Sequence, residues 1–82
     1  MARDPEGVRI EVECYAGYQA AEEPRAFTLE GTRRSILGIA DRWYDPLAAY
    51  FKVRASDGHG YLLRHDRQRD VWLLVKKFPA DG

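Results

Sequence analysis

The sequence predicts an all-β fold: a small, antiparallel and strongly bent barrel of about six short strands, of SH3-like or half-open type. Apolar and polar residues alternate along several segments, which is typical of strands with one wet face. Turns that contain Gly and Asp separate these segments at intervals of about 8–12 residues. The chain has 82 residues, enough for one core but not for two. We therefore expect a single domain over 1–82, with 1–7 and 79–82 as frayed tails.

The first predicted strand is 8–14, VRIEVEC, in which apolar side chains at even positions alternate with charged ones at odd positions. Cys14 is in phase with the apolar set, so we expect a buried thiol that packs as a small hydrophobe. It is the only cysteine, and no intrachain disulfide can form. The stretch 15–25, YAGYQAAEEPR, is polar and interrupted by Gly and Pro. It predicts a loop, with a helical turn at 19–23 as an option.

A hairpin is expected next along the chain. Phe27 and Leu29 share one face of a strand. The pair Glu30-Gly31 then suits a tight turn, because glycine supplies the positive φ that such turns require.

The strand after this turn changes phase. Ile36 and Leu37 cannot both face inward on a regular strand, and Gly38 beside them indicates a bulge or a sharp bend. Bends of this kind let a small sheet curl onto itself. Continuing the phase of Leu37 and Ile39 past the bend places Trp43 on the inner face.

Residues 45–49, DPLAA, lead into the last part of the sheet. Asp45 could cap a single helical turn with Pro46 at its first position, and an ordinary loop fits equally well.

A three-stranded meander follows. Asp57-Gly58 is a strong hairpin signal, and the highly charged stretch 65–70, HDRQRD, suits an exposed turn. The last strand, 71–75, VWLLV, is apolar on both faces, as expected for a strand enclosed by other elements.

The charges are unevenly distributed although the formal net charge is zero. Residues 1–32 carry three basic and seven acidic side chains, whereas 33–82 carry ten basic and six acidic ones. Opposite charges on neighbouring strands commonly stabilise a sheet, so the acidic first strand could pair beside basic later ones. The same asymmetry could instead leave a basic surface on one side of the barrel.

Residues 41–54, DRWYDPLAAYFKVR, hold four aromatic side chains among charges. Neighbouring residues on a strand point to opposite faces, so one aromatic of each adjacent pair should enter the core. The phase assigns Trp43 and Phe51 to the core and leaves Tyr44 and Tyr50 at the surface. The tyrosines and the basic residues around them form a candidate binding surface: Arg42, Tyr44, Tyr50, Lys52, Arg54 and Arg64.

Three interpretations of this surface stay open. The aliphatic parts of Lys and Arg side chains commonly pack over aromatic rings in β-sheets, and such packing requires no ligand. Tyr, Trp and Arg are frequent anchors of protein interfaces, and rings with cations also suit bases and phosphates. We expect a non-enzymatic protein-binding module, monomeric or weakly homodimeric, whose protein partner meets this surface or an open sheet edge. The alternative is a nucleic-acid-associated module that uses the same face with Arg54, Arg64 and Lys76.

The residue types that carry catalysis or bind metals form no recognisable constellation. A nucleophilic Cys14 would need a base beside it, and nothing in the sequence places His59 or His65 there. One cysteine and two histidines six positions apart do not match a zinc-ligand pattern. We therefore expect no enzymatic activity, no metal and no cofactor.

No apolar run approaches the roughly 18 residues of a membrane span. The first seven residues lack the apolar segment of a signal peptide. We expect a cytoplasmic protein without a membrane partner.

Several segments carry a family resemblance, namely CYAGY at 14–18, DRWY at 41–44, YFKVR at 50–54 and YLLRHD at 61–66. With Pro24, they resemble a family of short bacterial proteins of unknown function over nearly the whole chain. More distantly, the order of aromatic, Gly and Asp residues is similar to small domains encoded near accessory factors of error-prone DNA polymerases. Those domains usually have an aromatic residue where this chain has Leu29 and Ser35. The first resemblance implies no known activity, and the second implies a role related to DNA repair or replication.

Overall fold

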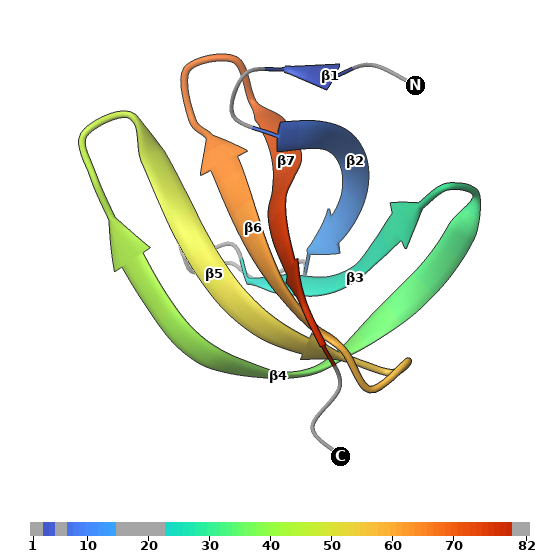
Figure 1. Ribbon diagram of the computed structural model, residues 1–82. Helices are drawn as coiled ribbons and strands as arrows, with labels where there is room; N and C mark the ends of the chain where they lie inside the picture. Colours follow the sequence, from blue (N-terminus) through green and yellow to red (C-terminus); the bar gives the residue numbers. More distant parts are fainter. Residues whose placement is uncertain (1–2, 5–6, 15–22, 80–82) are drawn as a thin grey trace.

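The computed structural model confirms the all-β fold: six antiparallel strands close into a small barrel (Figure 1). The structure describes residues 3–4, 7–14 and 23–79. The barrel strands are β2 (Gly7–Cys14), β3 (Pro24–Leu29), β4 (Thr32–Tyr44), β5 (Ala48–Ala55), β6 (Gly60–Asp66) and β7 (Val71–Phe78). Each strand pairs with the next in the chain, and β2 also pairs with β7, which closes the barrel. Figure 1 shows β4 curving around the barrel from its hairpin with β3 to its hairpin with β5.

The N-terminal part of the sheet differs in detail from the prediction. A two-residue strand, β1 (Arg3–Asp4), pairs with the start of β2 and was not predicted. β3 begins at Pro24, inside the predicted loop, and Pro24 pairs with Cys14 beyond a register shift. The optional helical turn at 19–23 lies, apart from Glu23, outside the described residues.

The predicted turns form with the expected chemistry. Glu30 and Gly31 both have positive φ, at 53° and 79°, between β3 and β4. Gly58 has φ 88° in the turn between β5 and β6. Asp45 does act as a cap, because its Oδ1 accepts hydrogen bonds from the backbone N–H of Leu47 at 2.8 Å and of the residue after it at 2.6 Å. No helix follows it in the described chain, so this connection is the loop alternative.

The seam between β2 and β7 depends on Gly7. The two strands run antiparallel with Val8 opposite Leu74 and Ile10 opposite Trp72. Gly7 has φ 145°, and a Cβ at this position would overlap with the carbonyl group of Leu74. Only glycine combines this backbone conformation with so close an approach.

The core lies inside the barrel and is built from aromatic and branched side chains of all six barrel strands: Ile10, Phe27, Leu29, Ile36, Ile39, Phe51, Val53, Tyr61, Leu63 and Trp72. Phe27 meets Tyr61 edge to face, with ring centroids 4.9 Å apart. Cys14 is partly buried and packs against this cluster, in line with the predicted apolar role of its thiol. Trp72 and Leu73 point to opposite faces and are both buried, so β7 is enclosed at this point as predicted.

The prediction for Trp43 and Leu37 is wrong: both are exposed, with 42% and 66% of their surface accessible. The register of β4 against β5 shifts twice, once at Leu37 and once at Ala40. The bulge predicted near Gly38 turns Leu37 outward. The second bulge reverses the phase again, so that Trp43 pairs with Tyr50 on the outer face. Phe51 is buried, as predicted.

Candidate functional site

Strand register arranges the outer face of β4–β7 in rows that take one residue from each strand. One row is Asp41, Lys52, Leu62 and Lys76. The next row is Gly38, Arg54, Gly60 and Phe78. The row on the other side is Trp43, Tyr50, Arg64 and Leu73. Because Phe51 and Val53 alternate with these positions and point into the core, the three rows lie on the outer side of the sheet, although Leu73 at the end of the third row is itself buried.

We call six of these residues the basic–aromatic face: Trp43, Tyr50, Lys52, Arg54, Lys76 and Phe78. Trp43 stacks on Tyr50 with ring centroids 5.5 Å apart and planes 9° from parallel. Arg64 holds Tyr50 from the other side, since its Nε donates to the Tyr50 Oη at 3.2 Å. Arg64 is itself 3.6 Å from the Asp66 carboxylate. The outermost ring of this stack, Trp43, is therefore held in place and open to a partner.

Two lysines lie over the Phe78 ring at the other end of the face. The Lys52 Nζ is 4.9 Å from the ring centroid and the Lys76 Nζ is 5.3 Å from it. Cation–π contacts at exposed sites are worth only about 0.5–1 kcal/mol. Both ammonium groups can therefore leave the ring when a stronger anionic partner approaches.

Among the described residues, the cations of this face have no acidic partner. In the part of the chain that the structure describes, neither Lys52, Arg54 nor Lys76 forms an ion pair with a carboxylate. Asp41 is the one acidic residue in the three rows described above, and its Oδ1 accepts a hydrogen bond from the Arg42 backbone N–H at 2.9 Å. The face is therefore locally positive.

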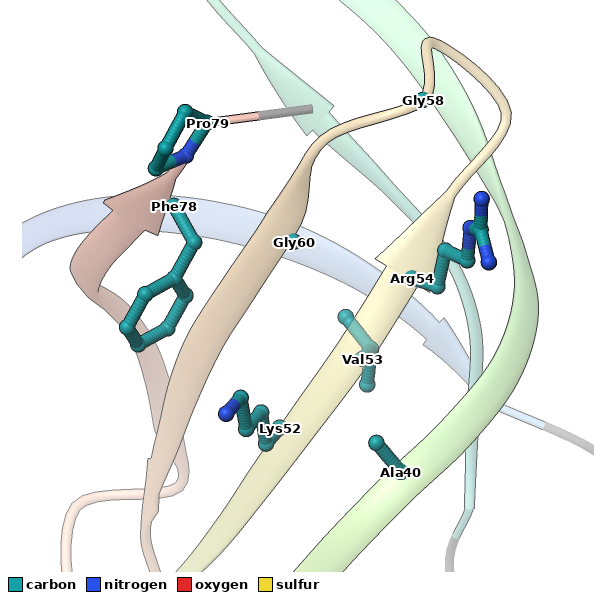
Figure 2. A pocket seen from close by; sticks show the side chains of 8 residues that line it. All are labelled: Ala40, Lys52, Val53, Arg54, Gly58, Gly60, Phe78 and Pro79. Atoms are coloured by element: carbon teal, nitrogen blue, oxygen red, sulfur yellow. The ribbon is translucent and has the colours of Figure 1, made fainter. Parts of the chain in front are cut away.

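A groove of about 470 Å³ crosses this face, lined by Ala40, Lys52, Val53, Arg54, Gly58, Gly60, Phe78 and Pro79. Figure 2 shows Phe78 and Arg54 on opposite sides of Gly60. Gly60 has no side chain, and the Phe78 side chain packs beside it, so that a Cβ on Gly60 would lie 3.4 Å from the Phe78 Cβ. The volume lies within the roughly 300–1,000 Å³ of small-molecule sites.

A carboxylate network fixes one end of this groove. Burial would raise the pKa of Asp57, but hydrogen bonds from the Tyr61 hydroxyl, the His59 backbone N–H and Arg34 outweigh it and hold the pKa at about 2. The Tyr61 hydroxyl donates to Asp57 at 2.5 Å, and the Arg34 Nε donates at 3.0 Å. Burial and the bond to Asp57 raise the pKa of Tyr61 to about 12. The β5–β6 turn, which carries Gly58 and leads into Gly60, is thereby fixed.

The structure divides the predicted surface. Tyr50, Lys52, Arg54 and Arg64 lie together on the outer face. Arg42 is opposite Phe51 in the register and turns away from them, and its guanidinium donates to Glu23 at 2.6 Å.

Tyr44 also lies apart from the basic–aromatic face. It is 57% exposed at the end of β4. The Arg67 guanidinium lies 5.9 Å from its ring centroid, and the Tyr44 side chain also interacts with Arg42.

Sequence reasoning missed two residues of the face. Trp43 was assigned to the core, because Ala40 gives no sign of a second bulge. Phe78 was assigned no role, although it is in phase with Lys76 at the end of the last strand. That two-residue spacing is the signal that could have found it.

The residues examined for catalysis lie elsewhere. His65 is buried, stacks on Trp72 with centroids 4.4 Å apart, and places its Nε2 2.9 Å from the Asp70 carboxylate. Neither His65 nor Cys14 lines the groove. Within the described ranges, no group of three or more His, Cys, Asp or Glu residues could hold a metal ion. The same ranges contain no helix long and apolar enough to cross a membrane.

Comparisons of the chain with protein families, with curated proteins and with solved structures found no match. The resemblance to a bacterial family therefore stays a prediction.

Proposed function

We propose that the protein is a non-enzymatic binding module for single-stranded nucleic acid, which it holds on the basic–aromatic face. One observation carries the proposal: Lys52, Arg54 and Lys76 have no acidic partner among the described residues, and the two lysines lie over the Phe78 ring on the same side of the barrel. Proteins that bind single strands combine cations along the phosphate backbone with rings on which bases stack. The face supplies both groups on rigid strands.

The composition of the face favours nucleic acid over the protein partner expected from the sequence. Lysine is depleted in the cores of protein interfaces, because its charge is costly to bury there. Two of the three unpaired cations are lysines. A phosphate backbone neutralises such groups without burying them.

The exposed rings favour a single strand over a duplex. Trp43 offers a ring that is held from behind by Tyr50, and Phe78 offers a second one beyond Lys52. Aromatic rings stack on bases that are free of a duplex partner, and each such contact is worth about 1–3 kcal/mol. This exceeds the cation–π energy that holds the lysines over Phe78.

A net charge of zero is compatible with this proposal, because the local field determines phosphate binding. The ion pairs of Glu13 with Arg33 and of Glu23 with Arg42 lie away from the basic–aromatic face. The Debye length is about 8 Å at physiological salt. Acidic residues farther than this from the face are therefore largely screened from a ligand bound there.

A salt titration tests the proposal. We expect the affinity for an oligothymidylate to fall between about 50 and 200 mM salt, with a log–log slope of about −2 for three cations on a single strand. A duplex of the same length should bind more weakly. Absence of oligonucleotide binding at low salt would contradict the proposal.

A protein partner is the second candidate, favoured by one separate observation. Leu37, Tyr44 and Leu47 are exposed by 66%, 57% and 51%, away from the unpaired cations. A double variant, Leu37→Ser with Tyr44→Ala, would lose a protein that co-purifies with the wild type while keeping its affinity for oligonucleotides. Several predictions from the sequence remain part of our proposal: the SH3-like or half-open barrel type, the bacterial family, the cytoplasmic location, the link to DNA repair or replication, and a monomer or weak homodimer.

A further inference from the structure

Two lysines on different strands converge on one aromatic ring. Lys52 of β5 and Lys76 of β7 both pair with Leu62 of β6, so two strand spacings separate their backbones by about 9.5 Å. Their ammonium groups nevertheless lie 4.9 and 5.3 Å from the centroid of the same ring, that of Phe78. Figure 2 shows the Lys52 side chain directed toward this ring. The third cation of the face, Arg54, points away from the ring toward β4 (Figure 2).

The convergence of the two lysines is electrostatically unfavourable without an anion, because like charges repel each other. Neither lysine forms an ion pair with a carboxylate in the described part of the chain. Asp41 is in the same row, but on the side of Lys52 that is remote from Lys76. The Phe78 ring offsets the repulsion only weakly, since cation–π contacts at exposed sites are small.

A phosphate monoester suits this pair of cations. It carries a charge of about −1.5 to −2 at neutral pH and offers three strong acceptor oxygens, whereas each phosphodiester within a strand carries a single charge. A lysine ammonium is a compact charge on a flexible four-carbon stem, so both groups can turn from the ring to one phosphate. Consecutive phosphodiesters would instead be matched by ammonium groups that are spread along the strand.

We infer that Lys52 and Lys76 together bind a terminal phosphate monoester of the single strand, beside the Phe78 ring. This inference rests on the proposed function and adds to it the recognition of a strand end. Arg54 would then contact phosphodiesters farther along the strand.

The test compares oligothymidylates of about 12 nucleotides that differ only at one end. The first ends in a hydroxyl group, the second in a phosphate monoester, and the third in the methyl ester of that phosphate. The methyl ester keeps the terminal phosphate but leaves it one negative charge. Each set is made for the 5′ end and for the 3′ end, because both ends can carry the same chemical group.

We expect the wild type to bind one monoester strand about tenfold more tightly than the hydroxyl strand near 50 mM salt, because the added charge meets two unpaired cations. It should bind the monoester about threefold more tightly than the methyl ester. Lys52→Gln and Lys76→Gln should each reduce both preferences to less than about twofold. Both lysines are exposed, so neither change should affect folding.

Arg54→Gln is the matched control, because it removes an exposed cation of the same face that points away from the Phe78 ring. It should weaken the binding of all three strands alike and keep the preference for the monoester. Thymidine monophosphate, added as a competitor, separates a strand end from a free nucleotide.

Each contrary result has a definite meaning. If the wild type binds the three strands alike, the phosphate site is wrong and the proposed function stands. If the preference survives in both lysine variants, or is also lost in Arg54→Gln, the assignment to this lysine pair is wrong. If thymidine monophosphate binds as tightly as the phosphorylated strand, or if a phosphoserine peptide binds at low salt and no strand does, both the strand-end site and the proposed function are wrong.

Discussion

Two groups of cations on this barrel have opposite surroundings. The arginines of β4 are paired with carboxylates: Arg33 with Glu13 at 2.7 Å, Arg34 with Asp57 at 3.0 Å and Arg42 with Glu23 at 2.6 Å. The cations on the outside of β5 and at the end of β7, namely Lys52, Arg54 and Lys76, have no such partner in the described chain. The first group joins segments that are distant in the sequence, whereas the second group is left for a ligand.

The difference explains how a chain of zero net charge can carry a positive face. Two of the paired carboxylates come from the acidic N-terminal part of the chain, and both are used on β4. The sequence allowed either cross-strand pairing or a basic surface. The structure contains both, on different parts of the barrel.

Removing the unpaired cations should have the largest effect. In a triple variant, Lys52→Gln, Arg54→Gln and Lys76→Gln, we expect oligonucleotide affinity to fall about 100-fold near 0.1 M salt, with the salt slope approaching zero. Stability should change by less than about 1 kcal/mol, since no ion pair is lost. The matched control removes three paired charges, Arg33→Gln, Arg42→Gln and Arg69→Gln, and should change the affinity less than about threefold. Equal losses of oligonucleotide affinity in the two variants would contradict a special role of the unpaired cations in binding.

The next effect concerns stability in the paired region. Asp57→Asn weakens the contacts to Arg34 and Tyr61 and should lower the free energy of unfolding at pH 7 by about 1–2 kcal/mol, after allowance for partial solvent exposure. The pKa of Asp57 is held at about 2, below its ordinary value of 3.8. Its contribution is therefore complete above that ordinary value and is lost as the pH falls through about 2.

Denaturant unfolding at several pH values measures this effect. The stability difference between wild type and Asp57→Asn should shrink from pH 4 to pH 2. Asp66, whose pKa is also held at about 2 by the backbone N–H and guanidinium of Arg69, loses its contribution in both proteins alike. A difference that stays constant across this range would contradict the assigned role of the Asp57 charge.

A smaller effect should come from the acidic residue beside the unpaired cations. Asp41→Asn removes the negative charge opposite Lys52 and should raise oligonucleotide affinity about two- to fivefold at low salt. Fluorescence anisotropy with a labelled strand would resolve this gain. An unchanged or weaker affinity would mean that the strand does not pass over this row.

The smallest effect should come from an individual exposed pair. A double-mutant cycle on Glu13→Gln and Arg33→Gln should give a coupling free energy close to the error of the measurement, because both side chains are about half exposed. The hydrogen bond from Arg33 lowers the pKa of Glu13, so the coupling should disappear in acid. A coupling well above that error would show that surface pairing stabilises this barrel more than expected.

The sequence predicted those parts of the fold that depend on local chemistry. Glu30-Gly31 and Asp57-Gly58 specify their turns through glycine, and Phe51 is correctly placed because β5 runs in unbroken register with β6. Trp43 was misplaced, because a bulge at Ala40 depends on how two strands fit together and alanine carries no signal for it.

The site was predicted in part for the same reason. Lys52 and Arg54 were identified from their own alternation on one strand. The position of the Lys52 ammonium over the Phe78 ring arises from pairing across β5, β6 and β7, which neighbouring letters of the sequence do not reveal. The groove depends in addition on Gly60. This residue matters because its partners on the two neighbouring strands are Arg54 and Phe78.

The seam between β2 and β7 sets the order in which the chain can complete its fold. The hairpins of β3 with β4, β5 with β6 and β6 with β7 join neighbours in sequence, and such units form within microseconds once the chain has emerged from the ribosome. Ile10, in contrast, can pair across the seam only after its partner Trp72 has been synthesised. A nascent chain that stalls before Val71 would expose two bare strand edges, which makes it a target for chaperones and an aggregation hazard.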